Sequence, residues 1–335
     1  GTANKLSGSS KMKILDKTVG AILSIFYILV ACLAFVSCDG NIEVANKNKP
    51  FDLQGHRGAR GNRPENTLPA FKYGIEQKMT SLELDTVVTK DDQLIIFHDT
   101  RLNGKLCLDT AGQPAKQISI SDLTVKELKT FDCGSLKNEK FPDQVPVPGT
   151  RLITLRELFE YVSQLDQKQE IHQKLLFNIE LKFPKNPSPK DFKKSAALIV
   201  QSIEAAGLVD RVTVQSFAID VLPVVKKLNP GIKTSALFQP TKTQGIQLYG
   251  GLSANSDEIL ERTIAVKADI ISPYYLYIKS DFVAAAHAAK IEVLPWTVND
   301  EDTMVKMMNL GVDGIISDYP ARLYRVHQKW VQSLK

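Results

Sequence analysis

The sequence of 335 residues shows no internal repeat, no low-complexity tract and only a small excess of positive charge, +5. Because 43% of the residues are apolar and 24% are charged, these absences exclude solenoid, fibrous and disordered proteins. Lysine and arginine do not cluster with aromatic residues, so the sequence has no electrostatic footprint for a nucleic acid. What remains is a globular chain of one or two domains.

Long apolar runs are equally scarce, and the single exception lies near the N-terminus. Residues 18–37 carry no charge, and Lys11, Lys13 and Lys17 precede them. Such a segment is an export signal or a membrane anchor, because about 20 apolar residues also suffice to span a bilayer. A lipoprotein signal, an uncleaved anchor and an ordinary cleaved signal all place the rest of the chain outside the cytoplasm.

The residues that end this run, Phe35-Val36-Ser37-Cys38, resemble a bacterial lipoprotein signal, in which the Cys is lipidated and becomes the new N-terminus. We therefore expect an exported periplasmic or cell-envelope protein that associates with the membrane through a lipid on Cys38 or through an anchor. On this interpretation residues 1–38 are an N-terminal extension with its signal. Residues 39–50 are a polar tether, and residues 51–335 form the folded domain.

Cysteines are also few. Removing residues 1–37 removes four Lys and one Asp and leaves a net charge of +2, so the basic balance belongs mostly to the signal. Of the four Cys, only Cys107 and Cys133 stay in the folded domain. In an exported protein they form a local disulfide or remain two free thiols.

The folded domain alternates strand-like runs with helical patterns. Thr154 and Glu157 have the spacing of a capping box, and Ser188-Pro189 is typical of a helix start. Residues 100–150 lack this rhythm and are rich in Gly, Pro, Asp, Asn and Ser, which favours an insertion after the second strand. Eight strands, each followed by a helix, predict an α/β protein with a (β/α)8 TIM barrel. The predicted strands are 51–56, 81–88, 175–182, 211–216, 232–238, 268–273, 291–297 and 312–317.

Carboxylates gather where the second and third predicted strands end. Glu83 and Asp85 are two residues apart and share one face of a strand, and so do Glu180 and Lys182. Barrel enzymes place their chemistry at these ends. Glu83, Asp85 and Glu180 offer only hard oxygen ligands, which suit one divalent cation, Ca²⁺ or Mg²⁺, and do not suit zinc.

Two histidines and two cations follow strands at the same end of the predicted barrel. Arg57 supplies a planar fork and Lys182 a point charge, and phosphate is the natural partner of both. His56 and His98 ionise near neutral pH and can act as general base and general acid on either side of a phosphorus atom. A metal with two His, Arg and Lys predicts phosphodiester cleavage.

The ordered motifs of residues 51–325 closely resemble the glycerophosphodiester phosphodiesterase family. Each motif alone would be weak, whereas their combination in this order is specific. Ser317 stands where Thr is commoner in the family, and no catalytic position is missing. The motifs are His56-Arg57-Gly58, Pro64-Glu65-Asn66-Thr67, Glu83-Leu84-Asp85, Thr89-Lys90-Asp91, His98-Asp99, Glu180-Leu181-Lys182, Gln215-Ser216-Phe217, Trp296 to Asn299 and Gly311 to Asp318.

The resemblance implies a TIM barrel with a small inserted subdomain and metal-dependent hydrolysis of small-molecule glycerophosphodiesters to sn-glycerol 3-phosphate and an alcohol. It gives the acid and base roles to His56 and His98, and the metal to Glu83, Asp85 and Glu180. It further implies that Arg57 and Lys182 hold phosphate and that Trp296 contacts glycerol. Glu65 would lie close to the metal and substrate, either as an additional ligand or as an orienting group.

Several alternatives stay open at this point. The substrate's glycerol hydroxyl attacks phosphorus and forms a cyclic phosphate, or water attacks directly. A lysophospholipase D-like enzyme, a phospholipase that ends at a cyclic phosphate, or a non-catalytic glycerophosphodiester-binding lipoprotein would share the same barrel. Tyr274, Tyr275 and Tyr277 line the mouth or pack on its rim. The oligomeric state is not predicted, and we expect the insertion at 100–150 to influence head-group preference.

Overall fold

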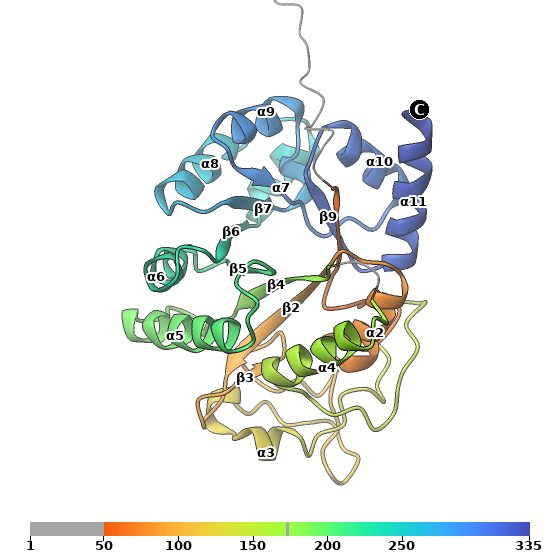
Figure 1. Ribbon diagram of the computed structural model, residues 1–335, viewed down its shortest axis with the longest axis vertical. Coiled ribbons are helices and arrows are strands. Elements are labelled where there is room, and N and C mark those ends of the chain that lie inside the picture. The colour runs from red at the N-terminus through yellow and green to blue at the C-terminus, as the bar shows by residue number, and fades with distance from the viewer. Residues whose placement is uncertain (1–49, 172–173) are drawn as a thin grey trace, which may run out of the picture. The chain divides into compact units, whose positions relative to one another are not determined.

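The computed structural model describes residues 50–171 and 174–335, so the predicted signal and Cys38 lie outside the described residues. Eight parallel strands form one curved sheet at the centre of this part of the chain, in the order β8-β7-β6-β5-β4-β2-β1-β9 (Figure 1). The predicted α/β barrel is thereby confirmed. The strands are β1 (Asp52–Gly55), β2 (Ser81–Val88), β4 (Leu176–Leu181), β5 (Val212–Ser216), β6 (Lys233–Phe238), β7 (Ile270–Pro273), β8 (Glu292–Val293) and β9 (Gly314–Ser317).

The two ends of the sheet, β8 and β9, meet through irregular backbone hydrogen bonds. The amide of Asp313 donates to the carbonyl of Val293 (2.9 Å), and the amide of Val298 donates to Ile316 (3.0 Å). The amide of Ile316 donates to Pro295 at 3.1 Å. These bonds make the barrel nearly closed and leave few strand edges unpaired.

Helices surround the sheet, and none of those in the described residues has the length and apolar content needed to cross a membrane. Several begin as their sequences predict. The Thr154 hydroxyl accepts from the Glu157 amide (3.2 Å), while the Glu157 carboxylate accepts from the Thr154 amide (2.8 Å). Ser188 caps the helix that starts at Pro189. The helices are α2 (Leu68–Glu76), α3 (Val125–Leu128), α4 (Leu155–Gln167), α5 (Pro189–Ala205), α6 (Leu222–Leu228), α7 (Lys242–Tyr249), α8 (Ser256–Ala265), α9 (Ser280–Ala288), α10 (Glu301–Asn309) and α11 (Pro320–Ser333), with 3₁₀ turns η1 (Ile120–Asp122), η2 (Ile219–Val221) and η3 (Tyr275–Tyr277).

The main hydrophobic core lies between the outer face of the sheet and these helices. Phe177 of β4 contacts Phe159 of α4, with ring centroids 5.1 Å apart. Leu82, Leu84 and Ile179 are fully buried in the same core. Because side chains alternate along a strand, the residues between these apolar ones point into the barrel. The polar positions of β2 and β4 are therefore directed inward.

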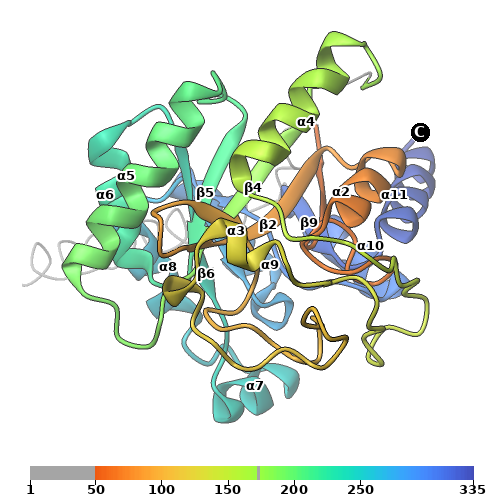
Figure 2. The same ribbon diagram turned by 90° about the horizontal axis from the view of Figure 1, so that it is seen from below.

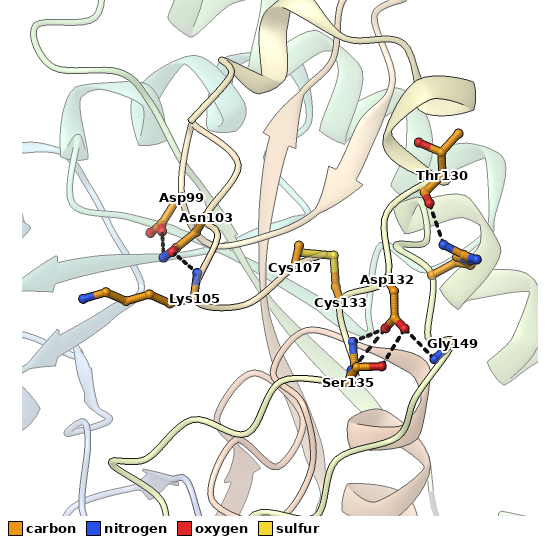
Figure 3. Close-up of a disulfide and its surroundings, with 11 residues drawn as sticks. Asp99, Asn103, Lys105, Cys107, Thr130, Asp132, Cys133, Ser135 and Gly149 are labelled. Carbon is orange, nitrogen blue, oxygen red and sulfur yellow. Dashed lines mark hydrogen bonds between the residues drawn. A yellow bond between two sulfur atoms is a disulfide. The ribbon is translucent and has the colours of Figure 1, made fainter. Parts of the chain in front are cut away.

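Residues 97–154 form an irregular segment with a small core of its own. The strand that leads into it, β3 (Leu94–Ile96), pairs antiparallel with β2. Cys107 and Cys133 are joined by a disulfide within this core (Figure 3). Asp132 accepts bonds from the Ser135 hydroxyl (2.6 Å) and from the Gly149 amide (2.9 Å), which ties the two sides of the segment together. The buried residues of this second core are Val87, Ile95, Phe97, Leu102, Cys107, Ala115, Ile120, Leu128, Cys133 and Leu152.

Candidate active site

The pairing of β2 with β4 brings the three predicted metal ligands together. In the parallel register Asp85 lies opposite Glu180, and Glu83 lies opposite Asn178. One oxygen atom from each of Glu83, Asp85 and Glu180 lies within 4.8 Å of the others, and all three residues are buried. A cluster with only carboxylate oxygens fits a hard divalent cation. The argument for a cation at this place rests on the kind of ligand atom, because all three residues offer carboxylate oxygens.

A layer of side-chain amides fills the barrel beneath these carboxylates. The Asn178 amide group donates to Gln54 (2.8 Å) and to Gln215 (3.1 Å). Gln215 in turn donates to Glu83 Oε1 at 2.9 Å. Asn66 donates to Asp85 Oδ2 at 2.8 Å. These bonds fix the orientation of the carboxylates before any ligand arrives.

The turn that follows β1 shapes the other side of the site and requires two glycines. A Cβ on Gly55 would lie 2.1 Å from the carbonyl oxygen of Gly58, which leaves no room for a side chain. Gly58 has φ +82°, and a Cβ there would lie 2.8 Å from the backbone of Ala70. The turn directs the amide of Arg57 onto Glu83 Oε2, at 2.8 Å.

Two cationic side chains flank the carboxylates. Arg57 Nη1 lies 2.7 Å from Glu65 Oε1, and its Nε lies 3.5 Å from Asp85. Lys182 Nζ lies 2.8 Å from Glu180 and 3.5 Å from Asp85. The resemblance implied substrate contacts for Arg57, Lys182 and Glu65, and the structure brings all three to the edge of the carboxylate cluster. Here Glu65 holds the guanidinium in place.

Burial and mutual repulsion set the protonation of the three carboxylates. Burial, reinforced by the charge of Asp85, raises the pKa of Glu83 well above its usual range. Burial raises the pKa of Glu180 to about 8, although Lys182 opposes the shift. The pKa of Asp85 is held below its usual range, against the effect of burial, by Lys182 and Arg57. A further positive charge would therefore favour the ionised form of all three.

His56 is buried at the end of β1 and paired with a distant carboxylate. Its Nδ1 lies 2.7 Å from Asp318 Oδ1, and its Nε2 lies 3.9 Å from Glu83 Oε2. Burial lowers the pKa of His56 to about 4, although Asp318 opposes this shift. The pKa of Asp318 lies below its usual range despite burial, because of His56 and Arg60. An ionised Asp318 accepts a hydrogen bond from the Nδ1–H group, so Nε2 is the nitrogen that faces the site.

The pair of Asp318 with His56 is supported by further polar groups. Arg60 Nε donates to Asp318 Oδ1 (2.8 Å) and its Nη2 donates to Oδ2 (3.1 Å). The amide group of Asn299 donates to the same carboxylate at 2.7 Å. Asp318 therefore accepts bonds from three side chains. Sequence reasoning assigned no role to Asp318, Arg60 or Asn299, although Asp318 and Asn299 belong to the quoted motifs.

His98 follows β3 and pairs with the residue next to it. Its Nδ1 lies 2.6 Å from Asp99 Oδ1, and Asn103 donates to Asp99 Oδ2 at 3.0 Å. The hydrogen bond with His98 lowers the pKa of Asp99. The amide of Phe97 donates to the Asp85 carbonyl (3.1 Å) and so ties His98 to the carboxylate strand. Like His56, His98 has its Nδ1 occupied by a carboxylate.

Aromatic side chains form one wall beside Lys182. Trp296 donates its indole N–H to the Ser272 carbonyl (2.9 Å) and contacts Phe217, with centroids 5.4 Å apart. The Lys182 ammonium lies 5.7 Å from the centre of the Phe217 ring. Tyr274 lies 5.6 Å from Trp296 and belongs to the same wall. Tyr277, in contrast, is fully buried, with its hydroxyl on Asn255 (2.8 Å).

Comparisons with known proteins agree with this geometry. Residues 56–322 match the glycerophosphoryl diester phosphodiesterase family. A glycerophosphodiester phosphodiesterase of Caldanaerobacter subterraneus is 30% identical over 274 residues, which cover 82% of this chain and 96% of the relative. A crystal structure of a glycerophosphoryl diester phosphodiesterase from Silicibacter pomeroyi superposes with a TM-score of 0.74 at 25% identity, covering 87% of this chain and 96% of the other. An Oleispira antarctica phosphodiesterase, solved with sn-glycerol-3-phosphate, shares the fold (TM-score 0.63, 24% identity, 83% and 96% covered).

Proposed function

The chain belongs to the glycerophosphoryl diester phosphodiesterase family, and from this premise we propose that it hydrolyses glycerophosphodiesters to sn-glycerol 3-phosphate and an alcohol. The observation that carries the proposal is the buried triad of Glu83, Asp85 and Glu180, together with two histidines whose Nδ1 atoms are each held by a carboxylate. A site for binding alone would not need both an acid and a base.

The triad would hold one divalent cation, Ca²⁺ or Mg²⁺, because it offers only oxygen ligands. When bound, the cation supplies Lewis-acid stabilisation of the charge that develops on the phosphate oxygens. The raised pKa values of Glu83 and Glu180 support a cation at this place, since a bound positive charge would favour the ionised form of both buried carboxylates.

The two histidines would move the protons. Each has its Nδ1 against a carboxylate, so each presents Nε2 to the substrate. One removes a proton from the attacking hydroxyl, and the other protonates the leaving alkoxide. Arg57 and Lys182 would bind the phosphate oxygens, because both lie at the edge of the triad.

The test uses residues 39–335 with glycerophosphocholine, first after chelation and then with added Ca²⁺ or Mg²⁺. We expect release of glycerol 3-phosphate only with metal, and its loss in His56→Ala. His287→Gln is the matched control, because His287 lies on the outer helix α9 and bonds Asp313 (2.8 Å) away from the triad. A folded protein that binds the diester without any turnover would refute hydrolysis and favour the binding lipoprotein.

A lysophospholipase D-like or cyclic-phosphate-forming enzyme is the second candidate, and the aromatic wall of Phe217, Tyr274 and Trp296 favours it. An apolar surface beside the reacting phosphate would suit a glycerol that still carries an acyl chain. The comparison to make is the ratio of kcat/KM for lysophosphatidylcholine and glycerophosphocholine. A ratio above one would favour the lipid substrate, and identification of a cyclic phosphate product would decide the course of attack.

We also propose that the protein is exported and tethered to the membrane at Cys38. The uncharged run 18–37 supports export, and the disulfide between Cys107 and Cys133 suits an oxidising compartment. Metabolic labelling with a radioactive fatty acid provides the test. We expect label in the wild type and none in Cys38→Ser, whereas an unlabelled wild type would refute the lipid anchor.

A further inference from the structure

A short helix at the open end of the barrel carries an apolar surface that the reaction does not use. α7 begins just after β6 ends, so it lies at the same end of the barrel as the carboxylates. Figure 2 shows it at the lower edge of the molecule, on the side away from the labelled C-terminus. Ile246, Tyr249 and Leu252 are 75%, 85% and 61% exposed. These three residues are called the α7 surface below.

Exposed large apolar side chains are concentrated at the α7 surface. Nine large apolar side chains are exposed among the described residues, and three of them fall within residues 246–252. The other six are scattered singly over the rest of the chain, which is normal for a protein surface. They are Val145, Phe217, Leu228, Ile264, Val305 and Leu334.

The segment is firmly attached, so the exposure follows from its packing. Leu248, on the opposite face of α7, is buried in the main core. The Lys279 ammonium donates to the carbonyl of Gly251 (2.5 Å), and the Tyr277 hydroxyl donates to Asn255 (2.8 Å). Both bonds connect the segment to the region of η3. The α7 surface is therefore held outward by contacts on its inner side.

The chemistry of the segment suits a lipid interface. From Thr243 to Ser256 no residue is charged, although exposed surfaces of soluble domains are usually rich in charge. Tyrosine with an apolar ring and a polar tip is enriched where membranes meet water, and Tyr249 is the most exposed member of the surface. Lys242 precedes the segment and suits anionic head groups, whereas the acidic Asp257 and Glu258 follow it.

A second copy of the chain fits this surface less well. Three side chains of this size bury at most about 500 Å². A stable protein interface needs about 800 Å² from each partner. A bilayer has no such threshold, because each apolar side chain that enters the interfacial layer adds to binding. The polar segment 39–50 spans up to about 40 Å when extended, so a membrane that holds residue 38 is within reach of the barrel.

We propose that the α7 surface inserts into the interfacial layer of a lipid bilayer and holds the open end of the barrel against the membrane. Tyr275 of η3 lies beside Tyr274, with ring centroids 4.7 Å apart, and Tyr274 contacts Trp296. The aromatic wall of the site thus connects to the side of the barrel that faces the lipid. The proposal rests on the tether for its geometry and does not depend on the identity of the diester.

The first test measures sedimentation of residues 50–335 with vesicles of phosphatidylethanolamine and phosphatidylglycerol. This fragment suits the test because it forms one compact unit and the Caldanaerobacter relative consists almost entirely of the same barrel. Ile246→Ser/Tyr249→Ser/Leu252→Ser should lower the bound fraction at least about tenfold. Leu228→Ser/Ile264→Ser/Leu334→Ser, which removes three exposed apolar groups elsewhere, should leave it unchanged.

Three outcomes would overturn the proposal. The first is that the wild-type fragment does not bind vesicles. The second is that both triple variants weaken vesicle binding equally. The third is that the wild type dimerises while the α7 variant is monomeric. Turnover of soluble glycerophosphocholine should be the same in wild type and both variants, so loss of membrane binding is distinguished from failure of the proposed hydrolysis.

A second measurement adds a reporter to the surface. The chain has two tryptophans, so a third gives a readable signal. Tyr249→Trp should show a blue shift of its emission when vesicles are added, because the indole leaves water. Ile264→Trp on α8 should show none. An unshifted emission from Tyr249→Trp would contradict insertion even if the protein binds vesicles.

Discussion

The two histidines of the site are built into the molecule in opposite ways. His56 has an 11% exposed side chain and pairs with Asp318, 262 residues away in the sequence. His98 has a 30% exposed side chain and pairs with Asp99, the next residue. Each imidazole has a carboxylate on Nδ1, but β1 and β9 of the barrel supply the first pair, while the segment after β3 supplies the second.

One half of the proposed acid–base pair therefore depends on closure of the barrel, and the other does not. His56, Asp318, Arg60 and Asn299 form a buried network that exists only when the last strands reach the first. His98 depends on its neighbour and on the segment with the disulfide. The barrel side is therefore suited to a fixed role and the inserted side to variation with the substrate.

The largest expected effect tests whether both halves are needed. His56→Ala and His98→Ala should each lower kcat/KM for glycerophosphocholine by about 10² to 10⁴, because each removes one proton-transfer group. Glycerol 3-phosphate release is the measurement, with His287→Gln as the unaffected control. Losses under about tenfold for both variants would refute the two-histidine scheme.

Next in size is the effect of the two carboxylates on stability. Asp318→Asn should cost about 3 to 5 kcal/mol, because it leaves Arg60 and His56 without their buried partner. Asp99→Asn should change stability by no more than about 1 kcal/mol, since the Asp99 side chain is 40% exposed. Urea unfolding of both variants measures the difference. Equal losses of stability in the two variants would show that the Asp318 and Asp99 carboxylates contribute alike to the fold.

The pH dependence of stability tests whether His56, on the barrel side, is buried in its neutral form. Burial lowers the pKa of His56 to about 4, against about 6.5 when unfolded, so in this range the unfolded chain binds the proton and the folded chain does not. His56 therefore destabilises the fold progressively as pH falls through this range, by on the order of 2 to 3 kcal/mol.

The control for this pH effect is His56→Gln, because Glu83 and Glu180 have raised pKa values that act with the opposite sign. Urea unfolding at a series of pH values should show the wild type losing more stability than His56→Gln between pH of about 6.5 and 4. Parallel curves for the two proteins would show that His56 is not buried in its neutral form.

A smaller effect on activity is expected on the inserted side. The disulfide closes a loop with a sequence separation of 26 residues, so Cys107→Ser/Cys133→Ser should loosen this segment by up to about 3 kcal/mol. Activity should fall less than in either histidine variant, and the relative rates on choline, ethanolamine and inositol diesters should shift. Unchanged relative rates would argue against a role of residues 100–150 in head-group preference.

Much of the architecture was predictable from local patterns. All eight predicted strands exist, and the strand predicted at 81–88 has the observed bounds of β2. Shorter strands such as β8 (Glu292–Val293) end sooner than the apolar run 291–297, because apolar residues continue where the ladder stops. Glu83, Asp85 and Glu180 could be grouped from their period of two and their positions at strand ends.

The rest of the site required contacts that no local pattern contains. The pairing of Asp318 with His56 and the bond of Glu65 with Arg57 depend on where distant turns meet. The choice between a disulfide and two thiols for Cys107 and Cys133 depended on the packing of the second core. Tyr277 and Tyr274, close in sequence, have different surroundings because η3 turns one inward.

The eight strands, the residue types at their ends and the uncharged run near the N-terminus could be identified from the chain alone, because hydrophobic period and composition are local properties. Which strand lies beside which was fixed only in the folded barrel. The register of Asp85 against Glu180, the burial that raises the pKa of Glu180 and the outward face of α7 follow from that arrangement. Each of these features depends on residues from distant parts of the chain, and these residues become neighbours only when the barrel closes.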